Sequence, residues 1–304
     1  MPPSDTSTGG VASCPVGCEA KTRLLFDLRG HRVTRCPDCG VYALEQAADP
    51  SESILDRSEF DGALQTLRLA NYARILGRLQ QLTPLKGRRL LDVGCSTGWF
   101  LDLANQAGCL CHGIEPDGFF YGRLRATMPA QVRLVQGAFS RDLPPDWGPF
   151  DIISFHDVFE HLPEPGRILE RCREQLVRGG YLVLSLPVAD GFAFRVGRVL
   201  YRLGVATALA RMFQINYPYP HLYYFTRRSI RLLAERSGFD VVWIEPLRAF
   251  SVRGSLHRAR MDRALGGFGL LKRYAGAGAL LTFALLEPLV PADNVLVILC
   301  SKAG

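Results

Sequence analysis

Four cysteines near the start of the chain occur in two short pairs. Three residues separate Cys14 from Cys18, two separate Cys36 from Cys39, and 17 lie between the pairs. Two turns that each present two thiolates can complete a tetrahedral zinc site, and four cysteines leave no open position for water or substrate. The spacing therefore predicts structural zinc. A disulfide pairing, or four unrelated thiols, are the alternatives.

The residues around these pairs are typical of a zinc ribbon. Segments 24–28 and 32–35 are rich in strand-forming residues and flank a turn at Gly30-His31, and a third such segment, 41–44, follows the second pair. We expect a zinc ribbon over residues 14–48. The preceding residues, 1–13, are polar and rich in Pro, Ser, Thr and Gly, which predicts a disordered tail.

A glycine turn between two apolar segments is the second feature that could do chemistry. Asp92 lies at the end of the segment 88–93, and Gly94 and Gly98 lead into a predicted helix over 98–107. Glycines let the backbone approach a ligand closely, and the N–H groups that begin a helix are free to bind it. The next segment ends at Glu115, where an acid can accept hydrogen bonds from both hydroxyls of a ribose.

Nicotinamide dehydrogenases share this geometry, so the turn must discriminate between cofactors. Their G-x-G-x-x-G turn cradles a pyrophosphate. The turn here is Asp92-x-Gly94-x-x-x-Gly98, and a carboxylate at the end of the strand would repel a pyrophosphate while suiting an ammonium group. The pattern disfavours a dinucleotide and favours a nucleoside that carries an amino acid.

Residues Asp92 to Gly98 and Glu115-Pro116 closely resemble the first two motifs of class I S-adenosylmethionine-dependent methyltransferases of the type 11/23 group. Further similar segments follow in the order of that family. Residues 132–139 resemble its third strand, 150–156 its fourth strand, and 176–187 a helix end, glycine turn and fifth strand; residues 157–163, 221–226 and 237–240 match other segments of the family. The resemblance covers about residues 90–245. It implies a Rossmann-like α/β fold with a seven-stranded sheet, S-adenosylmethionine as cofactor, and methyl transfer as the reaction.

The resemblance also implies a set of cofactor-binding residues. They are Asp92, Gly94, Cys95, Gly98, Glu115, Pro116, Ala138, Phe139 and His156. Many relatives carry an aspartate where this chain has Ala138 or Phe139, so the chain departs from the family pattern at the adenine end of the cofactor.

His161 is the candidate general base, because histidine titrates near neutral pH; the alternative is a packed residue after the fourth strand. Asp157, Glu160 and His161 also resemble the metal-binding residues of metal-dependent relatives, namely ubiquinone-pathway O-methyltransferases and small-RNA 2′-O-methyltransferases. His221 could complete such a divalent-cation site.

The remaining chain supplies the elements that position these residues. Apolar residues at helical spacing predict one or two linking helices within 49–86, which in methyltransferases often cover the cofactor pocket. The methyltransferase domain then spans 87–304 and ends in a strand over 294–301.

A helical insertion is expected at about 190–220. It carries Arg195, Arg198 and Arg202 on one side and a predicted apolar face on the other, made of Val196, Val199, Leu200 and Leu203. This pattern is typical of a lid, an amphipathic surface helix or a membrane-skimming helix. Residues 216–220 are expected to close over the acceptor pocket.

The charge of the chain indicates which kinds of partner it could bind. The net charge is +7, and residues 191–304 hold 16 Lys and Arg against 6 Asp and Glu, a surplus of 10. A basic third could face an anionic substrate, nucleic acid or a membrane surface.

The chain lacks a signal peptide and a membrane-spanning run, so we expect a cytoplasmic protein. We expect O-methylation of a small molecule such as a sugar, lipid or secondary metabolite. C- or N-methylation, or RNA modification through the ribbon and basic third, are the alternatives.

Overall fold

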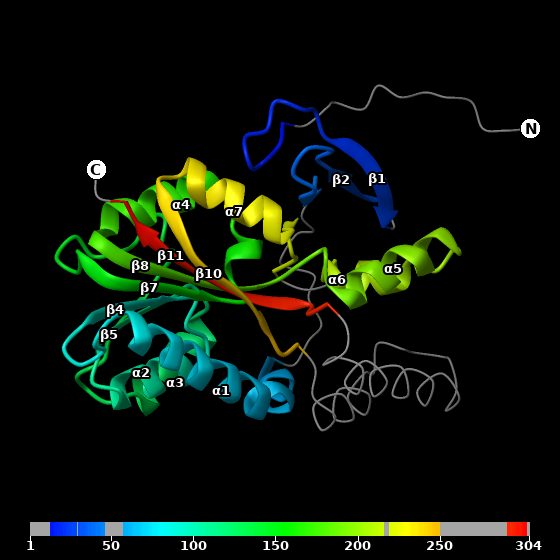
Figure 1. Ribbon diagram of the computed structural model, residues 1–304. Coiled ribbons are helices and arrows are strands. Elements are labelled where there is room, and N and C mark those ends of the chain that lie inside the picture. Colours follow the sequence, from blue (N-terminus) through cyan, green and yellow to red (C-terminus); the bar gives the residue numbers. More distant parts are fainter. Residues whose placement is uncertain (1–12, 29, 46–56, 216–218, 250–290, 303–304) are drawn as a thin grey trace, which may run out of the picture.

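The computed structural model describes residues 13–28, 30–45, 57–215, 219–249 and 291–302. Two sheets organise the chain (Figure 1): a seven-stranded sheet in the order β10-β11-β8-β7-β4-β5-β6, and a four-stranded sheet in the order β1-β2-β3-β9. Several predictions fall partly outside the described residues. They concern residues 1–12 of the predicted tail, the end of the predicted ribbon, the start of the linking segment, and positions 216–218 of the predicted closing loop.

The large sheet confirms the predicted Rossmann-like core. Its parallel strands are β4 (Arg89–Val93), β5 (Leu110–Glu115), β6 (Arg133–Gln136), β7 (Phe150–His156) and β8 (Leu176–Pro187). An antiparallel strand, β11 (Asn294–Ser301), lies between β8 and β10 (Phe239–Leu247). Carboxyl ends of parallel strands share one edge, so the residues that follow β4, β5, β6 and β7 gather there.

Helices cover both faces of this sheet (Figure 1). They are α1 (Arg57–Leu82), α2 (Trp99–Gln106) and α3 (Gly118–Thr127) on one face, and α4 (Pro165–Gln175) and α7 (Arg227–Arg236) on the other. Side chains alternate across each strand, so neighbouring residues serve different cores: Leu182 and Leu184 pack with α4 and α7, whereas Val183 packs with α1 and α2. Among the described residues of the linking segment, which begin at 57, there is one helix, α1.

The small sheet confirms the predicted hairpin and extends it. Strands β1 (Arg23–Leu28) and β2 (His31–Arg35) pair antiparallel, and β3 (Tyr42–Leu44) pairs with β2. Beyond the expected three strands, β9 (Tyr223–Tyr224) of the methyltransferase domain pairs antiparallel with β3. The two predicted units are therefore joined by a shared sheet.

The insertion forms two helices, α5 (Phe192–Arg202) and α6 (Thr207–Met212), that pack against the ribbon. The expected apolar face of α5 is wrong in part, since Val199 and Leu203 are 54% and 73% exposed. The helix instead buries Phe194, whose ring contacts Tyr42 of β3 and Tyr224 of β9. Aromatic packing against the ribbon thus decides which face is covered. None of the helices in the described residues combines the length and apolarity that a membrane span requires.

Candidate active site and cysteine centre

The turn after β4 brings the backbone close to the end of β7. Gly94 has φ of 68°, and a Cβ there would lie 2.7 Å from Cγ2 of Val158. Only glycine fits this approach without displacing its neighbour. Cys95 would contribute only its backbone to a bound cofactor, because its thiol packs in the core. A Cβ on Gly113 would lie 2.9 Å from Cys95 Sγ, and burial raises the pKa of that thiol well above its usual value.

Asp92 is a buried carboxyl at the floor of this turn. It is 3% exposed, and Ser154 Oγ donates a hydrogen bond of 2.8 Å to its Oδ1. Burial, with a smaller contribution from the negative charge of Glu115, raises the pKa of Asp92 to about 8, against the lowering effect of the Ser154 hydrogen bond. A cationic group placed here would restore the ionised form, as expected for the ammonium group of a methionine moiety.

Glu115 ends β5 on the same edge of the sheet. Its Oε2 accepts from the N–H of Ser96 at 2.8 Å, and its Oε1 accepts from the N–H of Asp117 at 2.9 Å. Burial raises its pKa. Because a carboxylate has about four acceptor positions, two remain for further donors such as ribose hydroxyls. The neighbouring Pro116 is exposed.

His156 ends β7 beside Asp92. Its Nδ1 lies 3.2 Å from Ser185 Oγ, while Nε2 lies 3.9 Å from Asp92 Oδ1 and is buried without a hydrogen-bond partner among the described residues. Burial, together with the charge of Arg68, lowers the pKa of His156 to about 3, so the imidazole is neutral. This polar pair forms the floor of the predicted cofactor site.

Helix α1 covers this floor, as the sequence predicts for linking helices. The Tyr72 ring lies 5.0 Å from His156 and 5.5 Å from Phe100, between ring centroids. Arg68, one turn earlier, lies 3.8 Å from the carboxylate of Asp157. Sequence analysis missed both residues, although Tyr72 belongs to the apolar spacing that predicts the helix.

The end of β6 presents an acid that the sequence analysis also missed. Asp142 Oδ2 accepts from the N–H of Ala138 at 2.8 Å. Phe139, in contrast, is buried and lies edge-on to Phe155 in the core. The exposed Asp142 carboxylate therefore lies beside the backbone of Ala138, at the end of the sheet where the sequence predicts the adenine, and the signal in the sequence was an acid four residues after Ala138.

Three side chains from two separate segments form what we call the acceptor cluster: Glu160, His161 and His221. One nitrogen or oxygen of each lies within 4.8 Å of the others. Glu160 and His161 belong to η2 (Phe159–His161), directly after β7, and His221 precedes β9. Asp157, with φ of 54°, turns its carboxylate towards Arg68 and is not part of this group.

Glu160 is fully buried, and neither carboxylate oxygen has a hydrogen-bond partner among the described residues. Its Oε1 lies 3.9 Å from His221 Nε2. Burial, with a smaller effect of the Asp157 charge, raises the pKa of Glu160 well above its ordinary value. Unpaired buried carboxylates are costly, so a donor or a cation is the expected partner of Glu160.

Hydrogen bonds define the tautomers of both histidines. His161 Nδ1 lies 2.9 Å from the carbonyl oxygen of Pro220, so it carries the proton and leaves the lone pair on Nε2. Tyr224 donates its hydroxyl proton to the carbonyl of Met212 and therefore accepts from His221 Nδ1, at 3.2 Å. His221 Nε2 then accepts from Gln214 Nε2 at 2.9 Å. Burial lowers the pKa of both imidazoles, which keeps them neutral.

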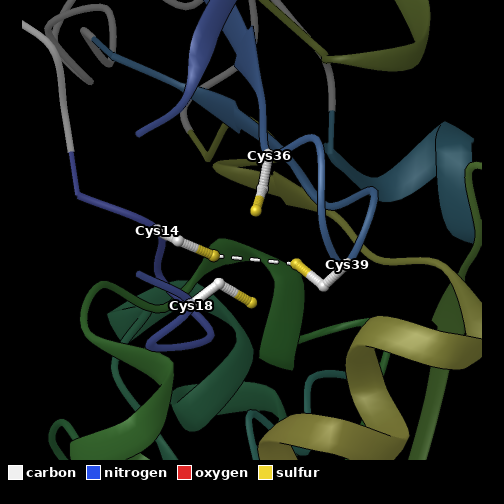
Figure 2. A group of neighbouring side chains, drawn as sticks. All are labelled: Cys14, Cys18, Cys36 and Cys39. Atoms are coloured by element: carbon white, nitrogen blue, oxygen red, sulfur yellow. Dashed lines mark hydrogen bonds between the residues drawn. The ribbon is translucent and has the colours of Figure 1, made fainter. Parts of the chain in front are cut away.

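The four predicted zinc ligands meet at the base of the ribbon. Figure 2 shows the side chains of Cys14, Cys18, Cys36 and Cys39 directed towards one another, and all four sulfurs lie within 4.8 Å of each other. Cys14 Sγ and Cys39 Sγ are 3.6 Å apart. Zinc with sulfurs about 2.3 Å away separates tetrahedral ligands by about 3.8 Å, so the residues fit this ion.

Chemistry of the cysteines agrees with this fit. All nine cysteines of the chain are free, including these four, so the alternative of a disulfide is not realised. The hydrogen bond from Cys39 lowers the pKa of the Cys14 thiol to about 5, while the same hydrogen bond and burial raise the pKa of the Cys39 thiol. The cluster therefore supplies a thiolate near neutral pH, which is the form that binds zinc.

Fold and site together define the class of protein. A seven-stranded sheet with one antiparallel strand, an acid after β5 and a glycine turn after β4 are the features of a class I S-adenosylmethionine-dependent methyltransferase. The family model of the methyltransferase domain matches residues 64–243, more than half of the chain, and the chain belongs to that family.

Curated relatives match the core. The chain is 33% identical over 117 residues to tRNA U34 carboxymethyltransferase of Aliivibrio fischeri (strain MJ11), covering 37% of this chain and 36% of that protein. It is 31% identical over 126 residues to ubiquinone biosynthesis O-methyltransferase of Paracidovorax citrulli (strain AAC00-1), covering 39% of this chain and 52% of that protein. The chain thus spans about half or less of the length of these relatives.

A solved structure agrees on the fold over a longer span. Magnesium protoporphyrin IX methyltransferase from Synechocystis PCC 6803, with bound SAH, superposes with a TM-score of 0.52 at 14% identity and covers 82% of this chain and 90% of that one. At this identity the likeness concerns the fold alone.

Proposed function

We propose that the protein transfers the methyl group of S-adenosylmethionine to a hydroxyl oxygen of a small molecule. The observation that carries this proposal is the acceptor cluster, which places a neutral imidazole with a directed lone pair directly after the strand that ends in His156. A hydroxyl acceptor is a weak nucleophile until it loses its proton, whereas a neutral amine attacks without prior deprotonation. The cluster suits the first case.

The residues around the cofactor fit S-adenosylmethionine, whose sulfonium supplies an activated methyl group. Asp92 would hold the ammonium group and Glu115 the ribose hydroxyls, while Asp142 offers an acceptor at the adenine end in place of the acid missing at Ala138. Gly94 and Gly98 let the backbone of the turn approach the cofactor. Tyr72 and α1 exclude water from this side. Fixed orientation of donor and acceptor supplies much of the rate of such a displacement.

His161 is the proposed general base. Its Nδ1–H is held by the carbonyl of Pro220, so Nε2 is oriented and can accept the acceptor proton. Burial lowers its pKa, which keeps the imidazole neutral at neutral pH. His221, in contrast, has its Nε2 engaged by Gln214.

The same cluster favours a second version of the chemistry, in which a divalent cation helps to remove the proton of the acceptor hydroxyl. The two unpartnered oxygens of Glu160 and the Nδ1–H bonds that orient both histidines are typical of carboxylate and imidazole ligands. Glu160, His161 and His221 would hold the ion, once Gln214 turns away from His221, and the ion would acidify the acceptor hydroxyl. Asp157 is not among the proposed ligands.

The acceptor is proposed to be a sugar, lipid or secondary metabolite. One relative named above acts on tRNA by its name, and the basic final third would suit RNA, so RNA is the competing acceptor. The ribbon over residues 14–48 is proposed to bind one structural zinc. Nine free thiols favour a reducing compartment such as the cytoplasm.

The test is a methyl-transfer assay with labelled S-adenosylmethionine and a metabolite extract, with and without ribonuclease. Label in a ribonuclease-resistant, low-mass product that has an ether-linked methyl supports the proposal. Label confined to RNA, with binding that weakens steeply as salt rises, supports the competitor. A mild chelator that spares the cysteine-bound zinc, followed by Mg²⁺ or Mn²⁺, then separates the two versions, because only the cation-assisted one loses and regains activity.

A further inference from the structure

A short backbone bridge connects the ribbon to the acceptor cluster. Leu222, next to His221, donates its N–H to the carbonyl of Glu160 at 2.9 Å and accepts from the N–H of Leu44 at 2.9 Å. One peptide segment is thus held between η2, which carries Glu160 and His161, and β3 of the ribbon. The geometry of the cluster depends on both sides.

The pairing continues past this bridge. Tyr42 lies opposite Tyr224, and Ala43 lies opposite Tyr223. The Tyr224 hydroxyl is the acceptor that fixes the proton of His221 on Nδ1. Because Tyr224 is held by β3, the tautomer as well as the place of His221 depends on the ribbon.

Strand β3 depends in turn on the cysteine turns. The N–H of Cys36 donates to the carbonyl of Val41 at 2.9 Å, and β3 begins at the next residue, Tyr42. Thr226, which follows β9 closely, donates its hydroxyl to the carbonyl of Cys39 at 2.9 Å. A unit of three short strands buries little apolar surface of its own, so bound zinc is expected to supply most of its folding energy.

We infer that the cysteine centre positions the acceptor cluster: zinc at Cys14, Cys18, Cys36 and Cys39 fixes β3, and β3 fixes His221 against Glu160 and His161. Leu44 and Leu222 are positioning residues in this scheme. A ribbon that served only to recognise a partner would need no strand pairing beside His221. The inference rests on the proposed function only in taking the cluster to be the acceptor site.

Hydrogen exchange of the full-length protein tests this without an acceptor. Wild-type protein should contain about one zinc, and the double variant Cys36→Ser, Cys39→Ser about none. In the double variant, amides in residues 219–225 should exchange about tenfold faster or more, because two backbone hydrogen bonds at Leu222 lose their support. Amides in 89–98 should not change, and S-adenosylmethionine affinity by calorimetry should stay within about twofold. Cys300→Ser, outside the ribbon, is the control and should match wild type.

Leu44→Pro is the sharper variant, since it keeps all four cysteines and removes the N–H donor to Leu222, together with the buried Leu44 side chain. It should retain zinc and still show faster exchange in 219–225. Unchanged exchange there in either variant would overturn the inference. So would a parallel loss of S-adenosylmethionine binding, because the ribbon would then support the whole domain rather than the cluster. Failure of the methyl-transfer assay would instead count against the proposed function.

Discussion

The proposed cofactor end and the proposed acceptor end of the site are built differently. Asp92, Glu115 and their partners follow consecutive strands of one sheet, and the carboxylates there already accept hydrogen bonds from Ser154, Ser96 and Asp117. The acceptor cluster combines η2 with a segment about 60 residues later, and its carboxylate is buried without such partners in the part of the chain that the structure describes. The first end is therefore fixed before any ligand binds. The second is assembled by tertiary contacts and is expected to be the more sensitive to distant changes.

The largest expected effect is at the acceptor end. His161→Ala should lower turnover by about 10²–10⁴-fold, the usual contribution of a general base, and leave S-adenosylmethionine affinity unchanged. Wild-type turnover at saturating S-adenosylmethionine should fall only at pH below 6.5, because burial lowers the pKa of His161 below 6.5 and only the neutral imidazole accepts a proton. Steady-state kinetics and calorimetry measure the two effects. His31→Ala, in the ribbon turn, is the matched control. Near-normal turnover of a folded His161→Ala protein would end both versions of the proposed chemistry.

At the cofactor end, Glu115→Ala should weaken S-adenosylmethionine binding by about 2–3 kcal/mol, because two charge-assisted hydrogen bonds to the ribose are lost together. Calorimetry of the variant against Glu174→Ala, an exposed acid on α4, gives the difference. Hydrogen exchange in residues 219–225 should be unaffected in this variant, which distinguishes an effect on the ribose site from an effect on the acceptor cluster. Wild-type affinity in Glu115→Ala would contradict the assignment of the ribose site.

Binding of S-adenosylmethionine should release a proton from Asp92. With its pKa at about 8 in the free protein, the carboxyl is mostly protonated at pH 7, and pairing with the ammonium group should release about one proton on binding. The release should vanish above about pH 9, where the carboxyl is already ionised. Calorimetry in buffers of different ionisation enthalpy counts the protons. Asp92→Asn should bind with no release, and an equal release in that variant would assign the proton to another group.

The smallest effect concerns Asp142. Asp142→Ala should weaken S-adenosylmethionine binding by about 0.5–1.5 kcal/mol, the net worth of one hydrogen bond to the adenine. Asp146→Ala is the matched control, because Asp146 is also exposed and pairs with Arg133 instead. Indistinguishable affinities of the two variants would remove Asp142 from the cofactor site.

The contrast between the two ends also explains what could be predicted. The predicted strands at 150–156 and 294–301 coincide with β7 and β11, because buried strands have continuous apolar sequences. The third strand ends at Gln136, three residues earlier than predicted, since the chain turns there to bring Asp142 onto the N–H of Ala138. The apolar spacing of α5 indicated the buried face wrongly in part, at Val199 and Leu203, because Phe194 finds aromatic partners in a different part of the chain.

The sequence by itself determined the fold class, the glycine turn, the acids that end the first two strands, and the four-cysteine spacing. Each of these is encoded by residues close together in the chain, where local backbone geometry decides the outcome. Only the tertiary structure decided that β9 pairs with β3, that His221 meets Glu160 and His161, and that Asp157 turns away to Arg68. These contacts join segments far apart in the sequence, and hydrogen bonds such as that between Leu44 and Leu222 form wherever packing brings a backbone donor to an acceptor, whatever the side chains.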